Sequence, residues 1–553
     1  MASFFDYFRG EGFTVAAMAI STGIYLLYVI VGKVQAYLSS PIRDLPGPPS
    51  VNWLTGCLPR HVWEPDSQEY QLEWTRQYGP VFRYFGWFNL DRVFATDLQA
   101  LNYILNAPEF EKTDDARFFL GDVLGKGLLF VEGLKHRQQR KIMSPAFGLP
   151  QIKEFSQLFV EKANELRDAL ITEVARSNTP DGSLKLDAFL WLNKATLDII
   201  GHAGFSHSFG SLHQEGTHEM TEGFRKSMSF NPFSFRFMIP ALFPPARIIP
   251  TDRSRALSST INATRALGKD LITRKKSEIL ASAEVDAKGG VEKRNIQGRD
   301  LLSLLIKANM ATDIPDSARM SDEEILAQVP TFLIAGHETT STSVGWGLFA
   351  LASNPAVHAK LKAEARAFYT DAPSMDELNG MTYLDYFTRE VLRLHAPVPQ
   401  TERVAKKDTI VRLGEPFVDR HGVKRQEFRL RKGDVIIIPI RTVHRLKSIW
   451  GEDADEFRPE RWEAIPEAVK SIPGVFSNLL TFIAGAHACI GYRFSIIEMK
   501  ALLFSFVRAF DFEFGVHPSD ITWRSMIVTR PFLTSDPDGG PQLPLVIRPA
   551  KSD

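Results

Sequence analysis

The chain has 553 residues, of which 44% are hydrophobic and 24% are charged, and its 65 basic side chains equal its 65 acidic ones. This balance argues against nucleic acid as a partner, because phosphate binding needs a surplus of basic residues on one face. The two cysteines, Cys57 and Cys489, are too few for a disulfide framework in a chain of this length and favour a reducing compartment.

The first predicted element is a membrane-spanning helix. Residues 12–32 run for 21 positions without a charge, about 31 Å as a helix, which matches the thickness of a bilayer core. A cleaved signal peptide is the alternative, but Asp6, Arg9 and Glu11 precede the apolar stretch where a signal peptide would carry a basic cluster. We therefore expect residues 1–44 to form an uncleaved anchor with its flanks, and the body to face the cytosol.

A hinge and a single large body are predicted after the anchor. Residues 45–50 read Leu-Pro-Gly-Pro-Pro-Ser, which cannot be helical and favours a stiff connector. Residues 51–553 contain no clear internal linker, so we expect one domain. It opens with a helix near 68–78 and a strand at 81–85.

Helical periodicity dominates the middle of the chain, roughly residues 135–400. Ser321 and Glu324 form a capping-box pattern, which predicts one helix from there to about residue 353, bent near Pro330. Residues 281–300 are predicted to be a surface loop. The C-terminal quarter adds short strand candidates, such as residues 434–439. The predicted fold class is mainly α with a minor β-sheet component.

Cys489 lies in the stretch 481–491, Thr-Phe-Ile-Ala-Gly-Ala-His-Ala-Cys-Ile-Gly, directly before an amphipathic helix. The helix N-terminus favours a thiolate, and Gly485 and Gly491 would let the backbone approach a flat group. His487 is only two residues away, and no further ligand pair at zinc spacing follows. A single thiolate without companions fits an axial ligand of heme iron.

The motif formed by Phe482, Gly485, His487, Cys489 and Gly491 resembles the heme-binding signature of the cytochrome P450 superfamily. The resemblance implies the cytochrome P450 fold and heme b (iron protoporphyrin IX) as cofactor. Cys489 would be the axial metal ligand, with Phe482 packed beside it. His487 would contact a heme propionate at a position where the family often has Arg.

The stretch Ala-Gly-His-Glu-Thr-Thr, residues 335–340, lies inside the long predicted helix. An acid and a hydroxyl in a helix interior can relay protons, although Thr side chains there often just bond back to carbonyls. In the family this stretch is the oxygen-activation groove. Thr339 would hold the oxygen and its waters, and Glu338 would connect them to solvent as the second catalytic residue.

A pair of opposite charges, Glu390 and Arg393, also resembles a family motif. Glu390 and Arg393 would form a buried structural triad with Arg461, although an isolated pair at this spacing is usually a surface contact. The triad would position the cysteine loop.

His136 and Arg140, four residues apart, would hold heme propionates together with Arg403. Arg137 and Lys141 project from a neighbouring face of the same helix. They would dock an acidic reductase or remain plain solvated charges.

The resemblance places substrate contacts in residues 118–123, 332–340, 396–401 and 526–529. Residues 229–240 are rich in aromatic residues and broken by prolines, so they either pack inside or dip into membrane lipid as an entry lip.

The implied function is a heme-thiolate monooxygenase of fungal type on the endoplasmic reticulum membrane. It would insert one oxygen atom from O2 into a lipophilic small-molecule substrate, for example a terpenoid of secondary metabolism, by C–H hydroxylation or epoxidation. No nucleotide-binding fingerprint is evident, so electrons would come from a separate NADPH-cytochrome P450 reductase. The alternatives are a heme-thiolate isomerase or dehydratase, a xenobiotic or fatty-acid hydroxylase, and a heme carrier without catalysis.

Overall fold

The structure is a computed structural model. It describes residues 39–58, 67–213, 252–285, 300–310, 319–525 and 527–550, with single positions within 21–35 and at 64 and 315. No helix in this part of the chain is long and apolar enough to cross a bilayer. The anchor predicted at 12–32 lies almost entirely outside the described residues, as does the predicted membrane lip at 229–240.

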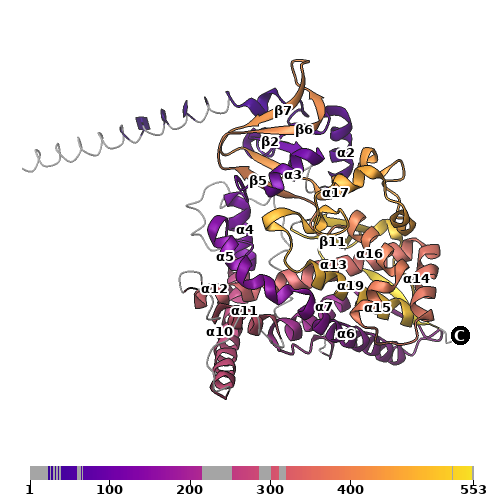
Figure 1. Cartoon of the computed structure of the whole chain (residues 1–553). Helices are drawn as coiled ribbons and strands as arrows, with labels where there is room; N and C mark the ends of the chain where they lie inside the picture. Colours follow the sequence, from indigo (N-terminus) through magenta and orange to yellow (C-terminus); the bar gives the residue numbers. More distant parts are fainter. Residues whose placement is uncertain are drawn as a thin grey trace, which may run out of the picture.

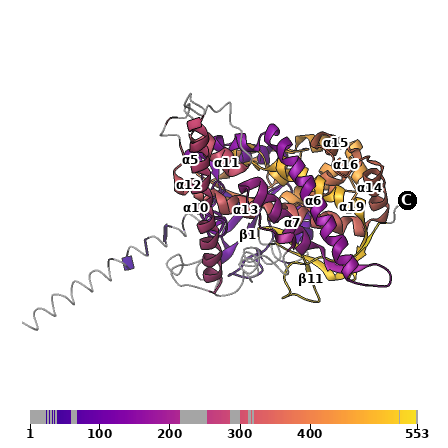
Figure 2. The ribbon, with the colours of Figure 1, turned by 90° about the horizontal axis from the view of Figure 1, so that it is seen from below.

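Four long helices form the centre of the molecule: α6 (Leu149–Arg176), α7 (Ala188–Phe205), α13 (Gln328–Ser353) and α19 (Tyr492–Ala509). Helix α13 packs against α7 and α19, and α19 packs against α6. Nearly every side chain of α13 is buried, as expected for a helix that is apolar on all sides. Both views place α13 among the other helices (Figure 1, Figure 2).

The remaining helices surround this centre. They are α2 (Ser67–Tyr78), α3 (Leu98–Asn106), α4 (Asp114–Leu124), α5 (Gly133–Met143), α10 (Asp252–Val285), α11 (Leu301–Met310), α12 (Asp322–Leu326), α14 (Pro355–Ala367), α15 (Met375–Gly380), α16 (Thr382–Leu394), α17 (Ile440–Val443) and α18 (Lys447–Trp450).

The described strands form four small sheets. The largest has the order β1 (Val81–Phe85), β2 (Asp91–Ala95), β8 (Val435–Ile438), β5 (Thr401–Ala405) and β3 (Phe110–Glu111). In it only β2 and β8 run parallel. Two of the others are hairpins, β6 (Thr409–Val418) with β7 (Lys424–Leu430) and β10 (Ile521–Ser525) with β11 (Thr529–Leu533). The last is a three-stranded sheet in the order β4 (Leu184–Asp187), β12 (Pro544–Pro549) and β9 (Phe510–Phe514). The predicted mainly helical fold with a minor sheet component is confirmed.

The long helix predicted from Ser321 to residue 353 is divided in two. The capping box of Ser321 and Glu324 is present and opens α12, but α12 ends at Leu326 and α13 starts at Gln328. Pro330 explains the division, because it has no N–H for the carbonyl of Leu326 and its ring crowds that carbonyl. Ala327 alone separates the two helices and keeps helical φ and ψ angles of −66° and −17°, so the helix is interrupted one turn before Pro330.

The loop predicted at 281–300 begins too early. Helix α10 continues to Val285, in keeping with the good helix formers Ala281, Ala283 and Glu284. Residues 286–299 lie outside the described part. The predicted elements at 68–78, 81–85 and 434–439 correspond to α2, β1 and β8, and residues 45–50 form no helix or strand.

Candidate active site

A cavity of about 540 Å3 lies between α13, the loop before α19, helices α4 and α5, strand β5 and the β10–β11 hairpin. Its lining is mostly apolar. Nine of the predicted site residues border it: Glu338, Thr339, Phe482, His487, Cys489 and Gly491, together with His136, Arg140 and Arg403. All four predicted substrate segments also contribute, for example through Phe119, Phe332, Val398 and Ile527.

Cys489 is presented by a tight loop. Its N–H donates to the carbonyl of Phe482 at 2.9 Å. The ring of Phe482 lies between those of Phe476 and Tyr492, with centroids 6.0 and 6.1 Å away. The hydrogen bond from Cys489 to Phe482 therefore joins the two ends of the loop. The exposed surface of Cys489 faces the cavity.

The two glycines of this loop differ in what they require. Gly485 has a φ of +70°, and a Cβ there would lie 2.2 Å from the carbonyl oxygen of Leu105. It is needed for close contact with the end of α3, not for a flat ligand as the sequence suggested. Gly491 has a negative φ, and a Cβ there would meet only the ring of Phe147 at 3.7 Å, so the described atoms do not require a glycine.

The thiol of Cys489 is not activated by the helix terminus alone. Burial raises the pKa of Cys489, although the N–H of Gly491 and the guanidinium of Arg140 act in the opposite direction. The expected effect of the α19 N-terminus is thus present but smaller than the cost of burying a thiolate.

A cluster of basic side chains borders one part of the cavity around Glu132. The carboxylate of Glu132 lies 3.0 Å from Nε2 of His487 and 2.7 Å from Nζ of Lys112. Burial opposes ionisation of Glu132, but hydrogen bonding to His487 and the charge of Lys112 lower its pKa to about 2. The rings of His136 and His487 lie 4.2 Å apart between centroids. Burial, with His487 and Lys112 nearby, lowers the pKa of His136 to about 3.

Arg140 and Arg403 complete this cationic cluster. Arg140 donates to the carbonyl of Ala488, next to Cys489. Arg403 is 3% exposed, and its Nη1 donates to the carbonyl of Glu402 at 2.8 Å. The carboxylate of Glu402 is itself paired with Arg92 at 3.2 Å. Lys112, Arg140 and Arg403 are thus three cations against the single carboxylate of Glu132, which leaves two positive charges without a partner carboxylate in the described cluster.

Glu338, expected to connect the oxygen site to solvent, is a buried residue in an ion pair. It is 8% exposed, and Arg530 from β11 contacts its Oε2 through Nε at 2.8 Å and Nη2 at 2.7 Å. Burial opposes ionisation of Glu338, but Arg530 and His337 hold its pKa below the usual value. The buried partner of this carboxylate is therefore an arginine that the sequence did not indicate.

Thr339 and Thr340 face different partners. Thr339 borders the cavity, and its hydroxyl donates to the carbonyl of Ala335 at 2.8 Å. Thr340 is 3.0 Å from the hydroxyl of Ser495 on α19. Behind Ser495 lies Glu498, which is fully buried, and burial raises its pKa well above the usual value despite the hydroxyl of Thr340.

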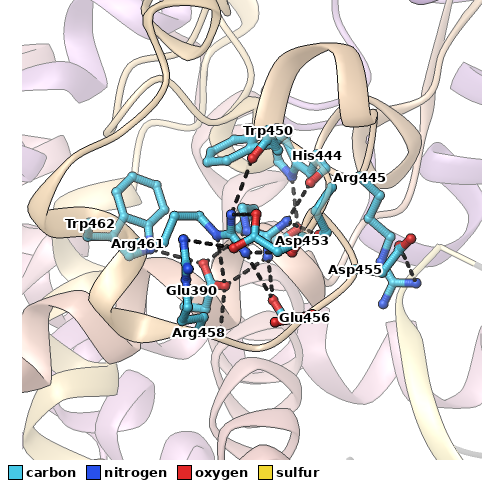
Figure 3. Close-up of polar contacts among 12 residues, drawn as sticks. Glu390, His444, Arg445, Trp450, Asp453, Asp455, Glu456, Arg458, Arg461 and Trp462 are labelled. Atoms are coloured by element: carbon cyan, nitrogen blue, oxygen red, sulfur yellow. Dashed lines mark hydrogen bonds and ion pairs between the residues drawn. The ribbon is translucent and has the colours of Figure 1, made fainter.

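Glu390, Arg393 and Arg461 form a buried cluster (Figure 3). Arg393 contacts both oxygens of Glu390, through Nε at 2.9 Å and Nη2 at 2.8 Å. Arg461 reaches Oε1 of Glu390 at 3.4 Å, and Trp462 donates its indole N–H to Oε2 at 3.1 Å. The carboxylate is therefore fully enclosed by donors, as a buried charge requires.

His444 links this cluster to the cysteine loop. Burial, with Arg393 nearby, lowers the pKa of His444 to about 3, so the ring is neutral. Its Nδ1 lies 3.0 Å from the carbonyl of Arg393, and its Nε2 accepts the N–H of Leu480 at 2.8 Å. The hydroxyl of Thr481 adds a second link by donating to the carbonyl of Leu392 at 2.8 Å.

Comparisons with known proteins agree with this geometry. Residues 46–534 match the family described as Cytochrome P450. The chain belongs to the cytochrome P450 family. Cytochrome P450 monooxygenase 205 of Postia placenta is 48% identical over 97% of this chain and 99% of the relative, and monooxygenase 128 of the same fungus is 44% identical over 92% and 93%. Cytochrome P450 monooxygenase claO of Ampulloclitocybe clavipes is 35% identical over 95% and 96%. The chain is thus a P450 monooxygenase with fungal relatives.

Cytochromes P450 are heme-thiolate enzymes, and the donor set of this P450 fits that group. The cavity offers one thiol, largely apolar walls and, beside them, two cationic charges without a partner carboxylate. A flat apolar macrocycle with two carboxylates matches each of these features. This fit follows from the residues that border the cavity and from the cations that lack a partner carboxylate. It does not use the sequence motif around Cys489.

Five residues of the P450 site were missed at the sequence level: Lys112, Glu132, His444, Glu498 and Arg530. Four of them lie far from the cysteine motif, and no local pattern marks them. Glu498 had a recognisable signal, because it is the single acidic residue of the last long helix, residues 492–509.

Proposed function

We propose that this P450 holds heme b with Cys489 as the axial ligand and inserts one oxygen atom from O2 into a lipophilic substrate. The observation that carries the proposal is the shared cavity: Cys489, the Thr339 region of α13 and the cationic cluster border the same largely apolar space. The heme iron, when bound, supplies the redox chemistry that no protein side chain can supply.

The chain's own residues would position the reactants and control protons. Arg140, Arg403, His136 and His487 would hold the propionates. The hydroxyl of Thr339 would hold a water or oxygen ligand at the cavity wall. The carboxylate of Glu338, kept ionised by Arg530, would accept and return protons through that wall. The apolar lining would exclude bulk water and orient the substrate.

We propose that electrons come from an NADPH-cytochrome P450 reductase that docks on α5. Arg137 and Lys141 are exposed on this helix, on the side away from buried His136. If they form the docking site, reversing both charges raises the reductase concentration needed for half-maximal turnover, most strongly at low salt. An unchanged requirement would exclude this surface.

We further propose a single-pass location in the endoplasmic reticulum membrane, with residues 12–32 as the anchor and 229–240 as a lipid-facing lip. The support is the uncharged run and the aromatic segment of the sequence, together with a largely apolar cavity. Deleting residues 12–32 should release the protein from carbonate-washed membranes. Retention of the shortened chain would contradict this role.

The function itself is tested by reconstitution with a reductase, NADPH and isotopically labelled O2, using a panel of terpenoids. We expect one labelled oxygen atom in the product and no turnover without NADPH. Conversion that proceeds without NADPH would indicate the isomerase or dehydratase alternative instead.

A further inference from the structure

The cavity has a second polar region, centred on Arg441 of α17. Arg441 borders the cavity but is only 7% exposed. Its N–H donates to the carbonyl of Pro399 at 3.0 Å, and its carbonyl accepts from Nε2 of Gln68 on α2 at 3.1 Å. The backbone of Arg441 is therefore fixed, and its side chain is held at the cavity wall.

The guanidinium of Arg441 lacks an anionic partner. Among the described residues no carboxylate lies within ion-pair distance of it, and its buried Nε has no hydrogen-bond acceptor. Three other buried arginines among the described residues are paired, Arg393 and Arg461 with Glu390 and Arg530 with Glu338, whereas buried Arg403 belongs to the cationic cluster around Glu132. A buried cation without an anion is costly, so such a group is retained where a ligand supplies the charge.

The surroundings of Arg441 suit the polar end of an otherwise apolar molecule. Its Cζ lies 5.0 Å from the ring centroid of Trp523 on β10. Burial, with Arg445 nearby, lowers the pKa of Arg441 to about 9, in keeping with the absence of a carboxylate beside it among the described residues.

This region is separate from the cationic cluster around Glu132. The hydrogen bonds and the ring contact of Arg441 in the described structure are with α2, Pro399 and β10, and its electrostatic neighbours are Arg445, His395 and His444. None of them involves α5, Lys112 or the cysteine loop. The anion expected at Arg441 is therefore a different one from the carboxylates expected at Arg140, Arg403 and His487.

We propose that Arg441 binds a carboxylate of the substrate, so that the substrate class is a lipophilic carboxylic acid. The inference rests on the proposed function, because it concerns the molecule that the same cavity oxidises. Binding of the carboxylate at α17 leaves the apolar body of the acid in the rest of the cavity. A carbon remote from the carboxylate would then lie on the Thr339 side of the cavity, where oxygen is held. Trp523 covers the aliphatic part next to the acid group.

The test uses full-length holoprotein and matched pairs of acid and methyl ester: dodecanoic, hexadecanoic and abietic acids. Binding is followed by the Soret shift. We expect at least one acid to bind about 10-fold or more tightly than its ester, as a charge-assisted hydrogen bond implies. Arg441→Met should abolish the difference and Arg441→Lys should keep part of it. Arg524→Met is the matched control, since Arg524 is exposed on the same strand as Trp523, and it should behave as wild type.

A second readout distinguishes ligand binding from a structural role. In the absence of acid, Arg441→Met should raise the Tm of the holoprotein, because it removes an uncompensated buried charge and keeps the aliphatic stem. A lower Tm, equal affinity of acid and ester in wild type, or no Soret response to any acid overturns the proposal. The reduced carbon-monoxide spectrum separates this failure from failure of the proposed function, because it stays normal if only the carboxylate assignment is wrong.

Discussion

Glu390 and Glu498 are both completely buried carboxyl groups, but the protein treats them in opposite ways. Glu390 receives donors from Arg393, Arg461 and Trp462. Neither carboxyl oxygen of Glu498 has a hydrogen-bond partner among the described residues, and burial raises its pKa well above the usual value. Glu390 is therefore part of a hydrogen-bonded structural cluster, whereas Glu498 is buried beside α13 without such partners.

Glu390→Ala should be strongly destabilising, because it leaves two buried arginines without their common anion. We expect a loss of about 3–5 kcal/mol in the free energy of unfolding, measured by urea denaturation. The matched control is Glu173→Ala, which removes an exposed pair with Arg176 and should cost no more than about 1 kcal/mol. Similar losses in both variants would contradict the assigned role of Glu390.

Glu498→Gln should change how stability depends on pH. Because burial raises the pKa of Glu498, the folded state keeps its proton at pH values where the unfolded chain has released it. Stability from this group is fully present below the ordinary carboxyl pKa of about 4 and is lost as pH rises.

The variant is neutral at every pH, so the Tm of wild type should fall relative to that of Glu498→Gln as the pH rises above the ordinary carboxyl pKa of about 4. Exposed Glu161→Gln is the control and should follow wild type. Parallel Tm curves for wild type and Glu498→Gln would show that Glu498 titrates normally.

At the scale of elements, the cysteine loop is held by α16 and α17 rather than by its own sequence. His444, which follows α17, joins the carbonyl of Arg393 to the N–H of Leu480. Thr481 contacts the last turn of α16. The position of Cys489 relative to α13 thus depends on helices that are distant in the sequence.

His444→Leu should weaken this attachment while the ion pairs of Glu390 remain. Two buried backbone groups lose their partner, at a cost of about 1–3 kcal/mol each. We expect a lower ratio of heme to protein after purification, together with reduced stability to urea. His421→Leu, at a position where the side chain is 56% exposed, should leave both quantities unchanged. Full heme content in His444→Leu would contradict the proposed link.

At the scale of the whole molecule, local patterns predicted the elements and the motif residues that line the cavity. The capping box at Ser321 and the cysteine loop depend on neighbouring residues, so the sequence displays them directly. The break at Ala327 was missed because Pro330 acts on a carbonyl one turn earlier. Contacts between distant segments, such as Arg530 with Glu338, were missed because they arise only when the β10–β11 hairpin meets α13.

Local sequence patterns also did not predict how charged side chains are distributed around the cavity. The sequence gives equal numbers of acidic and basic residues overall. It does not show that Lys112, Arg140 and Arg403 gather around one carboxylate, or that Arg441 lies buried without one. The excess positive charge at these two places, one beside Cys489 and the other at α17, is a property of the folded chain, and both proposals about bound anions depend on it.

The central claim is that the sulfur of Cys489 is the axial ligand of a heme in this cavity. The most direct measurement is the reduced carbon-monoxide difference spectrum of the full-length protein supplied with heme, compared with that of Cys489→Ser. We predict the Soret band typical of a thiolate-ligated heme in wild type and its complete loss in the variant. A wild-type protein that binds no heme, or a variant that keeps the thiolate spectrum, would contradict the account.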